Sequence, residues 1–299
     1  MQVVLLQPPF FRCLGSHNNQ VQLDLAYVSR FLDDAHIEHV VVNADHGFGG
    51  QRYVPWRELF EREESLRLAA DGEHPILDEA VEYVLGFEPE VVVIAGGDTT
   101  IPTKNIGSPY IAAQVSKKIR KSGVRTVGIG PVFMKETGPF AKWFDGIFMS
   151  AVNRSIVDFL VDNDIGFMGG VPVGVVPCFD HVVHGRPSDL VMTAFGCAHD
   201  CSFCLFPVVY SQNVTFQLVE TVLEDMEKRS KLVGNEMYLG DAIFPLNMRR
   251  LKVLADELEY TNYRFRCESR VVHCGQARIV GSDEAHRRQG GEGRAGEFG

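Results

Sequence analysis

Three cysteines lie close together in the stretch AFGCAHDCSFCLFP, residues 194–207. They are Cys197, Cys201 and Cys204, in the spacing C-x3-C-x2-C, and the 299-residue chain has only seven cysteines in all. Thiols gathered this tightly are typical of metal binding, because a disulfide would use two of them and leave the third over. The spacing therefore predicts a metal centre to which the motif supplies three protein ligands.

Two kinds of metal centre fit three clustered cysteines. A structural zinc ion needs four ligands, and only His199 inside the motif could supply the fourth, since Cys267 is far along the chain. A four-iron cluster held by three thiolates instead leaves one iron open to a substrate or cofactor. We therefore favour an iron–sulfur cluster that acts on a ligand, with zinc as the alternative.

The first half of the chain has the pattern of a doubly wound parallel sheet. Short apolar runs alternate with helical patterns, which predicts strands that are buried on both faces. The predicted strands are 3–7, 39–43, 90–97, 125–131 and 145–150, and the predicted helices lie near 25–32, 57–69, 76–86, 109–122 and 152–162. Ligands of such sheets bind at the carboxyl ends of the strands. Two of those ends carry glycine-containing stretches, GGDTT at 96–100 and GIGP at 128–131, which would let a bulky ligand approach the backbone.

A second parallel βα system follows a stretch rich in Gly and Pro. Residues 164–188 lack a hydrophobic period and predict a linker between two domains, 1–163 and 189–272. The second domain is predicted to have strands at 189–193, 236–240 and 263–269 and helices at 215–232 and 246–259. The cysteine motif comes directly after the first of these strands, in a position where loops of βα barrels carry chemistry.

The predicted linker contains a second group of possible metal ligands, Cys178, His181 and His184. Neighbouring residues offer no further ligand at the spacing of a tetrahedral site. We interpret the three as ordinary polar residues of the linker, with metal binding as the less favoured alternative.

The motif GCAHDCSFC, residues 196–204, resembles that of the radical S-adenosylmethionine (SAM) family, with Phe203 in the place of its aromatic residue. The resemblance implies a [4Fe–4S] cluster on the three cysteines, whose open iron binds SAM. It also implies reductive cleavage of SAM to methionine and a 5′-deoxyadenosyl radical. An electron donor such as flavodoxin or ferredoxin and a small-molecule substrate would be the partners.

The flanking sequence is similar to that of B12-dependent radical SAM proteins. QPPF and LDLAYVSRFLDDAHIEHVVVN resemble their Rossmann-like cobalamin-binding domain, and EMYLGDAIFPLNMRRLKVLADEL and RCESR resemble their second and third barrel strands. The resemblance implies SAM binding by Phe203, Asp241, Glu268 and Arg270, and cobalamin binding by Gly96, Gly97, Asp98, Thr99, Thr100, Gly128, Gly130 and Pro131. Carboxylates suit an ammonium group and ribose hydroxyls, and Arg suits a carboxylate. The alternative for Glu268 and Arg270 is that they are exposed charges at a strand end.

The mode of cobalamin binding is a separate question. One known arrangement places a cobalt-binding histidine in a D-x-H-x-x-G motif. The loop FFRCLGSHNNQ has His17, but Gly15 and Gln20 stand at the Asp and Gly positions. Because no carboxylate is offered to orient the ring, we do not expect His17 to bind cobalt. A vestigial domain that binds no cobalamin is the alternative.

Composition and charge exclude several classes of protein. The formal net charge of −10 disfavours a general nucleic-acid binder. The N-terminus, MQVVLLQPPF, lacks the basic residues and apolar length of a signal peptide, and no run of about 20 apolar residues predicts a membrane span. We therefore expect a cytoplasmic protein without nucleic-acid or membrane partners.

The hydrophobic pattern ends near residue 270. The tail 273–299 is rich in Gly, Arg and Glu, which predicts an irregular or disordered segment. Only three βα strands are predicted after the linker, so we expect a barrel that is truncated.

Three functional hypotheses follow. The leading one is a cobalamin-dependent radical SAM enzyme that transfers a methyl group or performs a related radical reaction. The second is a catalytically incompetent remnant that acts at most as a corrinoid- or small-molecule-binding α/β module, and the third is a zinc-stabilised protein. Methylthiotransferases share the triplet but carry further cysteines before it, whereas here only Cys13 precedes residue 178, which argues against that branch.

Overall fold

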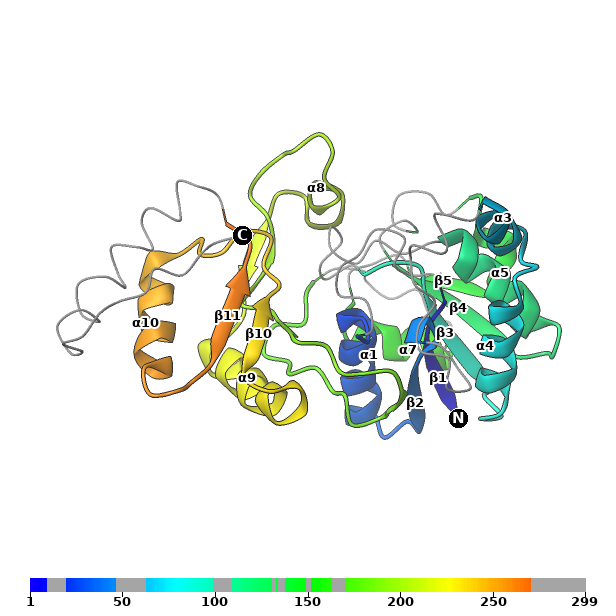
Figure 1. Cartoon of the computed structure of the whole chain (residues 1–299), viewed down its shortest axis with the longest axis horizontal. Coiled ribbons are helices and arrows are strands. Elements are labelled where there is room, and N and C mark those ends of the chain that lie inside the picture. Colours follow the sequence, from blue (N-terminus) through cyan, green and yellow to red (C-terminus); the bar gives the residue numbers. More distant parts are fainter. Residues whose placement is uncertain are drawn as a thin grey trace.

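The computed structural model describes residues 1–9, 20–46, 63–98, 109–130, 133, 138–148, 152–162 and 170–269. Two α/β halves lie side by side, with the N-terminal half on the right of Figure 1 and the C-terminal half on the left. Arg270, Thr99, Thr100, Pro131, Cys13, His17 and the tail 273–299 lie outside the described residues.

The N-terminal half is built on a six-stranded sheet. Its strands are β1 (Val3–Gln7), β2 (His39–Asn43), β3 (Val91–Ala95), β4 (Arg125–Ile129), β5 (Gly146–Phe148) and β6 (Val182–His184). The spatial order is β5-β4-β3-β1-β2-β6, and every neighbouring pair is parallel. The chain reverses its direction of winding at β1, so the topological switch point lies between β1 and β3. The predicted doubly wound parallel sheet is confirmed.

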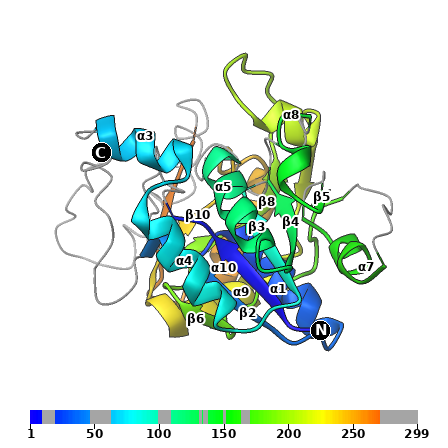
Figure 2. The ribbon, with the colours of Figure 1, turned by 90° about the vertical axis from the view of Figure 1, so that its right-hand side faces the viewer.

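Helices cover both faces of this sheet because its central strands are apolar on both sides. Val3 and Leu5 of β1 pack into one core with α1 (Leu23–Asp34) and α7 (Ser155–Asp162). Val4 and Leu6 pack into a second core with α4 (Pro75–Leu85) and α5 (Pro109–Arg120), beside which α3 (Glu63–Asp71) lies. Figure 2 shows α4 and α5 in front of the strands. Two short 3-10 turns, η1 (Ala44–His46) and η2 (Ala141–Trp143), complete this half.

Part of the predicted linker belongs to the first sheet. β6 pairs with β2, and the backbone N–H of Val41 donates to the carbonyl of His181 at 2.8 Å. An isolated bridge joins Gln20 to Arg186. The stretch 182–184 therefore forms the edge of the N-terminal sheet, although its Gly- and Pro-rich surroundings predict only a connection.

The C-terminal half contains the three parallel strands that the sequence predicts. β7 (Leu190–Val191), β10 (Glu236–Leu239) and β11 (Arg264–Cys267) lie in the order β11-β10-β7, with α9 (Val219–Val233) and α10 (Met248–Leu258) packed beside them. An antiparallel ribbon of β8 (Ala194–Gly196) and β9 (Val214–Phe216), and the short helix α8 (Phe206–Tyr210), lie beyond β7. The fold is thus a Rossmann-like domain followed by part of a βα barrel.

One hydrophobic core runs through both halves. Tyr27 and Val28 of α1 belong to the same buried group as Phe195, Cys197 and Phe206 of the C-terminal half. The backbone N–H of Cys178 also donates to the carbonyl of Ala26 at 3.0 Å, which fixes the connecting segment on α1. Burial of this shared apolar surface holds the halves in one arrangement. No helix among the described residues is both long enough and apolar enough to cross a membrane.

Candidate functional site

The cysteine loop is held at both ends by the β8–β9 ribbon. Residues 197–213 leave the ribbon at Gly196 and return at Val214, and these two residues pair directly. Gly196 has φ of +87°, and a Cβ atom there would overlap the carbonyl oxygen of Asn213. Glycine is therefore required at the position that precedes Cys197. The ribbon was not predicted, because its strands have only three residues each.

The three cysteines of the motif are free thiols on a short length of backbone. Cys197 is buried, whereas Cys201 and Cys204 are half-buried. The backbone N–H of Cys204 donates to the carbonyl of Cys201 at 3.0 Å, which closes a turn between them. Thiols arranged in this way can serve as ligands of an iron–sulfur cluster or of a single zinc ion.

The cysteine loop is anchored on the N-terminal domain by aromatic side chains. The ring of Phe195 meets that of Tyr27 at 6.2 Å between centroids, and Phe206 stacks on Tyr210 at 5.8 Å. Burial raises the pKa of Tyr210 well above its ordinary value, and the nearby carboxylates of Asp24 and Asp98 raise it further. The Tyr210 hydroxyl therefore stays protonated at physiological pH. The loop thus lies against α1 and the carboxyl end of β3.

Asp98 has a structural partner at this edge. It follows β3 and is fully buried, and its Oδ2 accepts the backbone N–H of Leu23 at 3.2 Å. A carboxylate at the first turn of a helix pairs with the positive end of the helix dipole. Asp98 therefore fixes the start of α1 at the carboxyl edge of the sheet, and its predicted contact with cobalamin stays a prediction.

The glycines at this edge are required by packing within the protein. A Cβ atom at Gly96 would lie 2.7 Å from the ring of Phe133, and one at Gly128 would lie 3.1 Å from it. Gly130 has φ of +138°, and a Cβ atom there would lie 2.7 Å from the backbone nitrogen of Gly97. The carboxyl ends of β3 and β4 thus approach each other and Phe133 closely. Cobalamin binding by these glycines and Gly97 stays a prediction.

Asp241 ties the turn after β10 to the chain that leads into the cysteine loop. It is buried, and its carboxylate accepts hydrogen bonds from Thr193 N at 2.7 Å, Thr193 Oγ1 at 2.5 Å and Ala194 N at 3.1 Å. These contacts follow from the parallel register, in which Leu239 lies opposite Val191. Asp241 therefore positions the segment before the motif, while its predicted contact with SAM stays a prediction.

Glu268 and Phe203, two further residues predicted to bind SAM, are exposed. Glu268 follows β11, and its Oε1 accepts the Tyr238 hydroxyl at 2.9 Å. Burial raises the pKa of Tyr238, and the hydrogen bond to Glu268 raises it further. Phe203 is 89% exposed in the cysteine loop. Their roles in SAM binding are untested.

The carboxyl ends of β7, β10 and β11 bring the predicted residues of the C-terminal half to one edge. Because these strands are parallel, Thr193, Asp241 and Glu268 all lie just beyond the same side of the sheet. In Figure 1 this edge and the α8 loop both lie at the top of the molecule.

Arg250 of α10 is a cation at this edge that sequence analysis missed. Its guanidinium lies over the Phe216 ring at 5.8 Å, and its Nε and Nη2 atoms are buried without a hydrogen-bond partner among the described residues. Burial lowers the pKa of Arg250, whereas the charge of Asp241 raises it. Nothing in the sequence MRRLKV marks this residue, because its burial depends on a strand far away in the chain.

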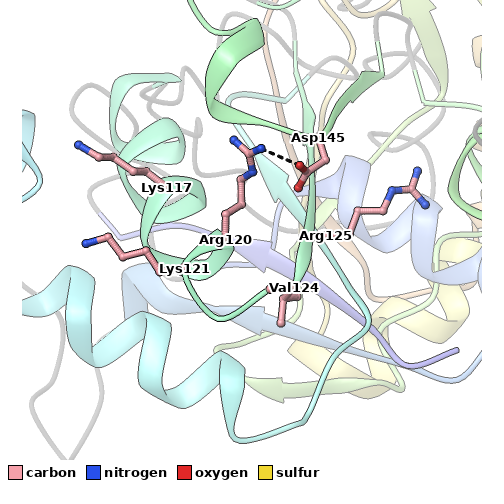
Figure 3. A pocket seen from close by; sticks show the side chains of 7 residues that line it. Lys117, Arg120, Lys121, Val124, Arg125 and Asp145 are labelled. Carbon is pink, nitrogen blue, oxygen red and sulfur yellow. Dashed lines mark ion pairs between the residues drawn. The ribbon is translucent and has the colours of Figure 1, made fainter.

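A hollow on the surface of the N-terminal half lies away from these residues. It has a volume of about 670 Å³ and is lined by Lys117, Arg120, Lys121, Gly123, Val124, Arg125 and Asp145, at the amino end of β4 (Figure 3). Arg120 pairs with Asp145 at 2.8 Å, and Arg125 donates to the Leu160 carbonyl at 2.8 Å. These arginines hold neighbouring elements together, and none of the predicted site residues lines the hollow.

Comparison with solved structures shows a shared fold. The chain resembles the radical SAM methyltransferase TsrM from Kitasatospora setae with cobalamin and a [4Fe–4S] cluster bound, at a TM-score of 0.53 and 16% identity. It resembles the same protein with tryptophan substrate and a SAM analogue bound, at a TM-score of 0.51 and 14% identity. Both comparisons cover 96% of this chain but only 54% and 53% of the TsrM chains. No protein-family model matches the sequence, and neither does any curated protein.

Proposed function

We propose that this chain carries the cobalamin- and cluster-binding part of a radical SAM methyltransferase or a related radical enzyme. When bound, a three-thiolate [4Fe–4S] cluster supplies the electron that cleaves SAM to a 5′-deoxyadenosyl radical, and cobalamin supplies a carrier for a methyl group. The shared fold with TsrM and the cysteine triplet support this proposal. The proposed localisation is the cytoplasm, and the proposed electron donor is a flavodoxin or ferredoxin.

The observation that carries the proposal is the position of the cysteine loop. Cys197 belongs to the same buried core as α1, and Tyr210 lies beside Asp98 at the carboxyl end of β3. This end is next to the switch point at which doubly wound sheets bind ligands. A cofactor on the cysteine loop and a corrinoid at the switch point would thus share one side of the molecule.

The chain's own residues have distinct roles in this proposal. Cys197, Cys201 and Cys204 are the thiolate ligands, and Asp241 holds the backbone before them through Thr193 and Ala194. Glu268 faces the same edge and offers carboxylate oxygens to polar groups of SAM. The buried core around Phe195 and Phe206 excludes water from the inner side of the loop.

Anaerobic reconstitution with iron and sulfide tests the cluster. We expect about four irons per chain, visible absorption typical of a [4Fe–4S] cluster, and release of 5′-deoxyadenosine from SAM on reduction. The variant Cys197→Ala/Cys201→Ala/Cys204→Ala should lose all three signals. Cys267→Ala, which removes an exposed thiol outside the motif, should lose none of them.

The outcomes separate the hypotheses. A cluster without 5′-deoxyadenosine release would support the catalytically incompetent remnant. One tightly held zinc per chain that the triple cysteine variant loses, together with no cluster, would overturn both of those proposals.

Retention of hydroxocobalamin tests the N-terminal domain separately. We expect the corrinoid to stay with the protein through desalting, and the triple cysteine variant to retain it equally well. A further variant, Phe133→Trp, enlarges the side chain that fills the space beside Gly96 and Gly128 and should weaken retention. Loss of the corrinoid from the wild-type chain on desalting would contradict cobalamin binding.

A further inference from the structure

A second group of metal-binding side chains lies at the opposite end of the N-terminal sheet from the cysteine loop. Asp33 is near the C-terminus of α1, His39 begins β2, and His181 immediately precedes β6. One carboxylate oxygen and one nitrogen of each ring all lie within 4.8 Å of one another. Among the described residues this is the one group of three such side chains found so close together, and it joins residues separated by about 140 positions in sequence.

Short contacts orient the three side chains toward one another. His181 Nε2 lies 2.7 Å from Asp33 Oδ1, and the rings of His181 and His39 are 4.2 Å apart between centroids. His39 Nδ1 lies 2.9 Å from the carbonyl of Ile37. A metal-binding histidine commonly donates its other ring N–H to such a carbonyl, which leaves Nε2 with its lone pair.

The group is buried on its inner side and open to solvent on its outer side, as a site that an ion enters must be. His39 is buried at the inner side, whereas the side chains of Asp33 and His181 are 33% and 37% exposed. Asp33 also accepts a hydrogen bond from the thiol of Cys178, and burial raises the pKa of that thiol to about 11. The contact with Cys178 helps to orient the carboxylate, and the outer side of the group is open to solvent.

We propose that Asp33, His39 and His181 form a binding site for a divalent transition-metal ion, with zinc as the ion that best suits two imidazoles and one carboxylate. The carboxylate of Asp33 and one ring nitrogen each of His39 and His181 would hold the ion. His39 Nε2 lies 2.8 Å from the Ser29 hydroxyl oxygen. The ion would bind the connecting segment to the ends of α1 and β2.

Cobalt titration tests the site without interference from the cysteine loop. The protein is the full chain with Cys197→Ala/Cys201→Ala/Cys204→Ala, stripped with a chelator, and the probes are Co²⁺ followed by Zn²⁺. We expect one Co²⁺ per chain with ligand-field absorption in the visible range, displacement by Zn²⁺, and a rise in melting temperature with either ion.

Variants identify the ligands. His181→Ala and His39→Gln should each weaken Co²⁺ binding by about tenfold or more. His184→Ala is the matched control, since it removes a histidine of the same segment whose ring faces Tyr83 at 5.4 Å, and it should bind Co²⁺ as tightly as the parent. His181 is partly exposed, so His181→Ala should fold, and near-ultraviolet circular dichroism checks that it does.

Two results would overturn the proposal. One is the absence of stoichiometric Co²⁺ binding in the parent. The other is unchanged Co²⁺ affinity in folded His181→Ala. Neither result bears on cluster assembly, because the test protein lacks the three cysteines of the motif.

Discussion

Gly196 determines how the chain enters the cysteine motif. Its positive φ and the closeness of the Asn213 carbonyl leave no room for a side chain. We expect Gly196→Ala to strain the backbone or separate the β8–β9 ribbon, by about 1–3 kcal/mol. Cluster content after reconstitution should fall markedly, while the far-ultraviolet circular dichroism should change little, because the two main sheets are unaffected.

Gly234→Ala is a suitable control for this prediction. Gly234 also has a positive φ, +89°, but nothing lies within 4 Å of its missing Cβ atom. The Gly234→Ala variant should therefore be less stable than the wild type but should assemble as much cluster. Equal cluster content in both variants would contradict a role of Gly196 in shaping the loop.

Asp241 is expected to contribute to stability through the hydrogen bonds that it accepts. Asp241→Ala would leave buried donors of Thr193 and Ala194 unpaired, at a cost of about 1–3 kcal/mol for each such group. Asp241→Asn retains one acceptor oxygen and should lose less. Urea unfolding measures the stability of both variants. If Asp241→Ala were as stable as the wild type, the hydrogen bonds that Asp241 accepts would contribute nothing to stability.

At the scale of the element, the N-terminus of α4 depends on the protonation of His74. Its Nδ1 accepts the backbone N–H of Ile76 at 3.3 Å, and burial lowers the pKa of His74 from its ordinary value of 6.5, with Glu79 acting in the opposite direction. A lowered folded-state pKa means that the unfolded chain takes up the proton first. The contribution of the cap is therefore fully present above pH 6.5 and is lost as the pH falls through the folded-state pKa.

The comparison of His74→Ala with the wild type measures this contribution. At about pH 7.5 the variant should be less stable by about 1 kcal/mol, the usual worth of a helix cap. As the pH falls below the folded-state pKa of His74 the difference should become small, because protonated His74 cannot accept the hydrogen bond. His74→Ser should cap the helix at all pH values, because a hydroxyl does not titrate in this range. If the stability difference between His74→Ala and the wild type did not depend on pH, His74 would not be the cap of α4.

The main elements could be predicted because their signals are local. The apolar runs VVLLQ, HVVVN and EVVVIA predict β1, β2 and β3, and the helical periods predict α4, α5, α9 and α10 within a few residues. The short elements β6, β8 and β9 could not be predicted, since a strand of three residues shows too little of the alternating pattern. Each of them is stabilised by the hydrogen bonds of a partner strand. The partner of β6 is β2, far away in the sequence, and β8 and β9 pair with each other.

The candidate site was predictable in its ligands but not in its supports. The spacing of Cys197, Cys201 and Cys204 is visible in the sequence, whereas the burial of Arg250 and the meeting of His181 with Asp33 and His39 depend on the fold. For the same reason the hydrogen bond from the Leu23 backbone N–H to Asp98 could not be predicted, and the contact of Asp98 with cobalamin stays a prediction. A motif within one loop can be recognised from the sequence alone, whereas a group assembled from several elements cannot.

At the scale of the whole molecule, the buried side chain of Arg229 joins α9 to the connecting segment. Arg229 is 1% exposed, donates to Asp225 Oδ1 at 2.8 Å and to the Ser188 carbonyl at 2.6 Å, and lies over the Phe179 ring at 4.2 Å. We expect Arg229→Ala to lower the free energy of unfolding by about 3–5 kcal/mol, because it leaves Asp225 buried and unpaired.

Two further variants test this explanation by urea unfolding. Asp225→Leu/Arg229→Met replaces both charges with apolar groups and should recover much of the loss. Lys231→Ala removes a cation of the same helix that pairs with Glu227 in solvent, and should leave the midpoint of urea unfolding nearly unchanged. A double variant as unstable as Arg229→Ala would point to lost packing instead of an unpaired charge.

The edge strand β6 has a consequence for how the molecule can be divided. A gene fragment that ends at residue 163, where the composition changes, would encode a sheet whose β2 edge offers unpaired backbone groups to a second copy. A fragment that continues through residue 188 keeps β6 on that edge and the bridge from Gln20 to Arg186. The N-terminal domain is thus closed by residues that follow its last helix, and it can be completed only after the connecting segment has been synthesised.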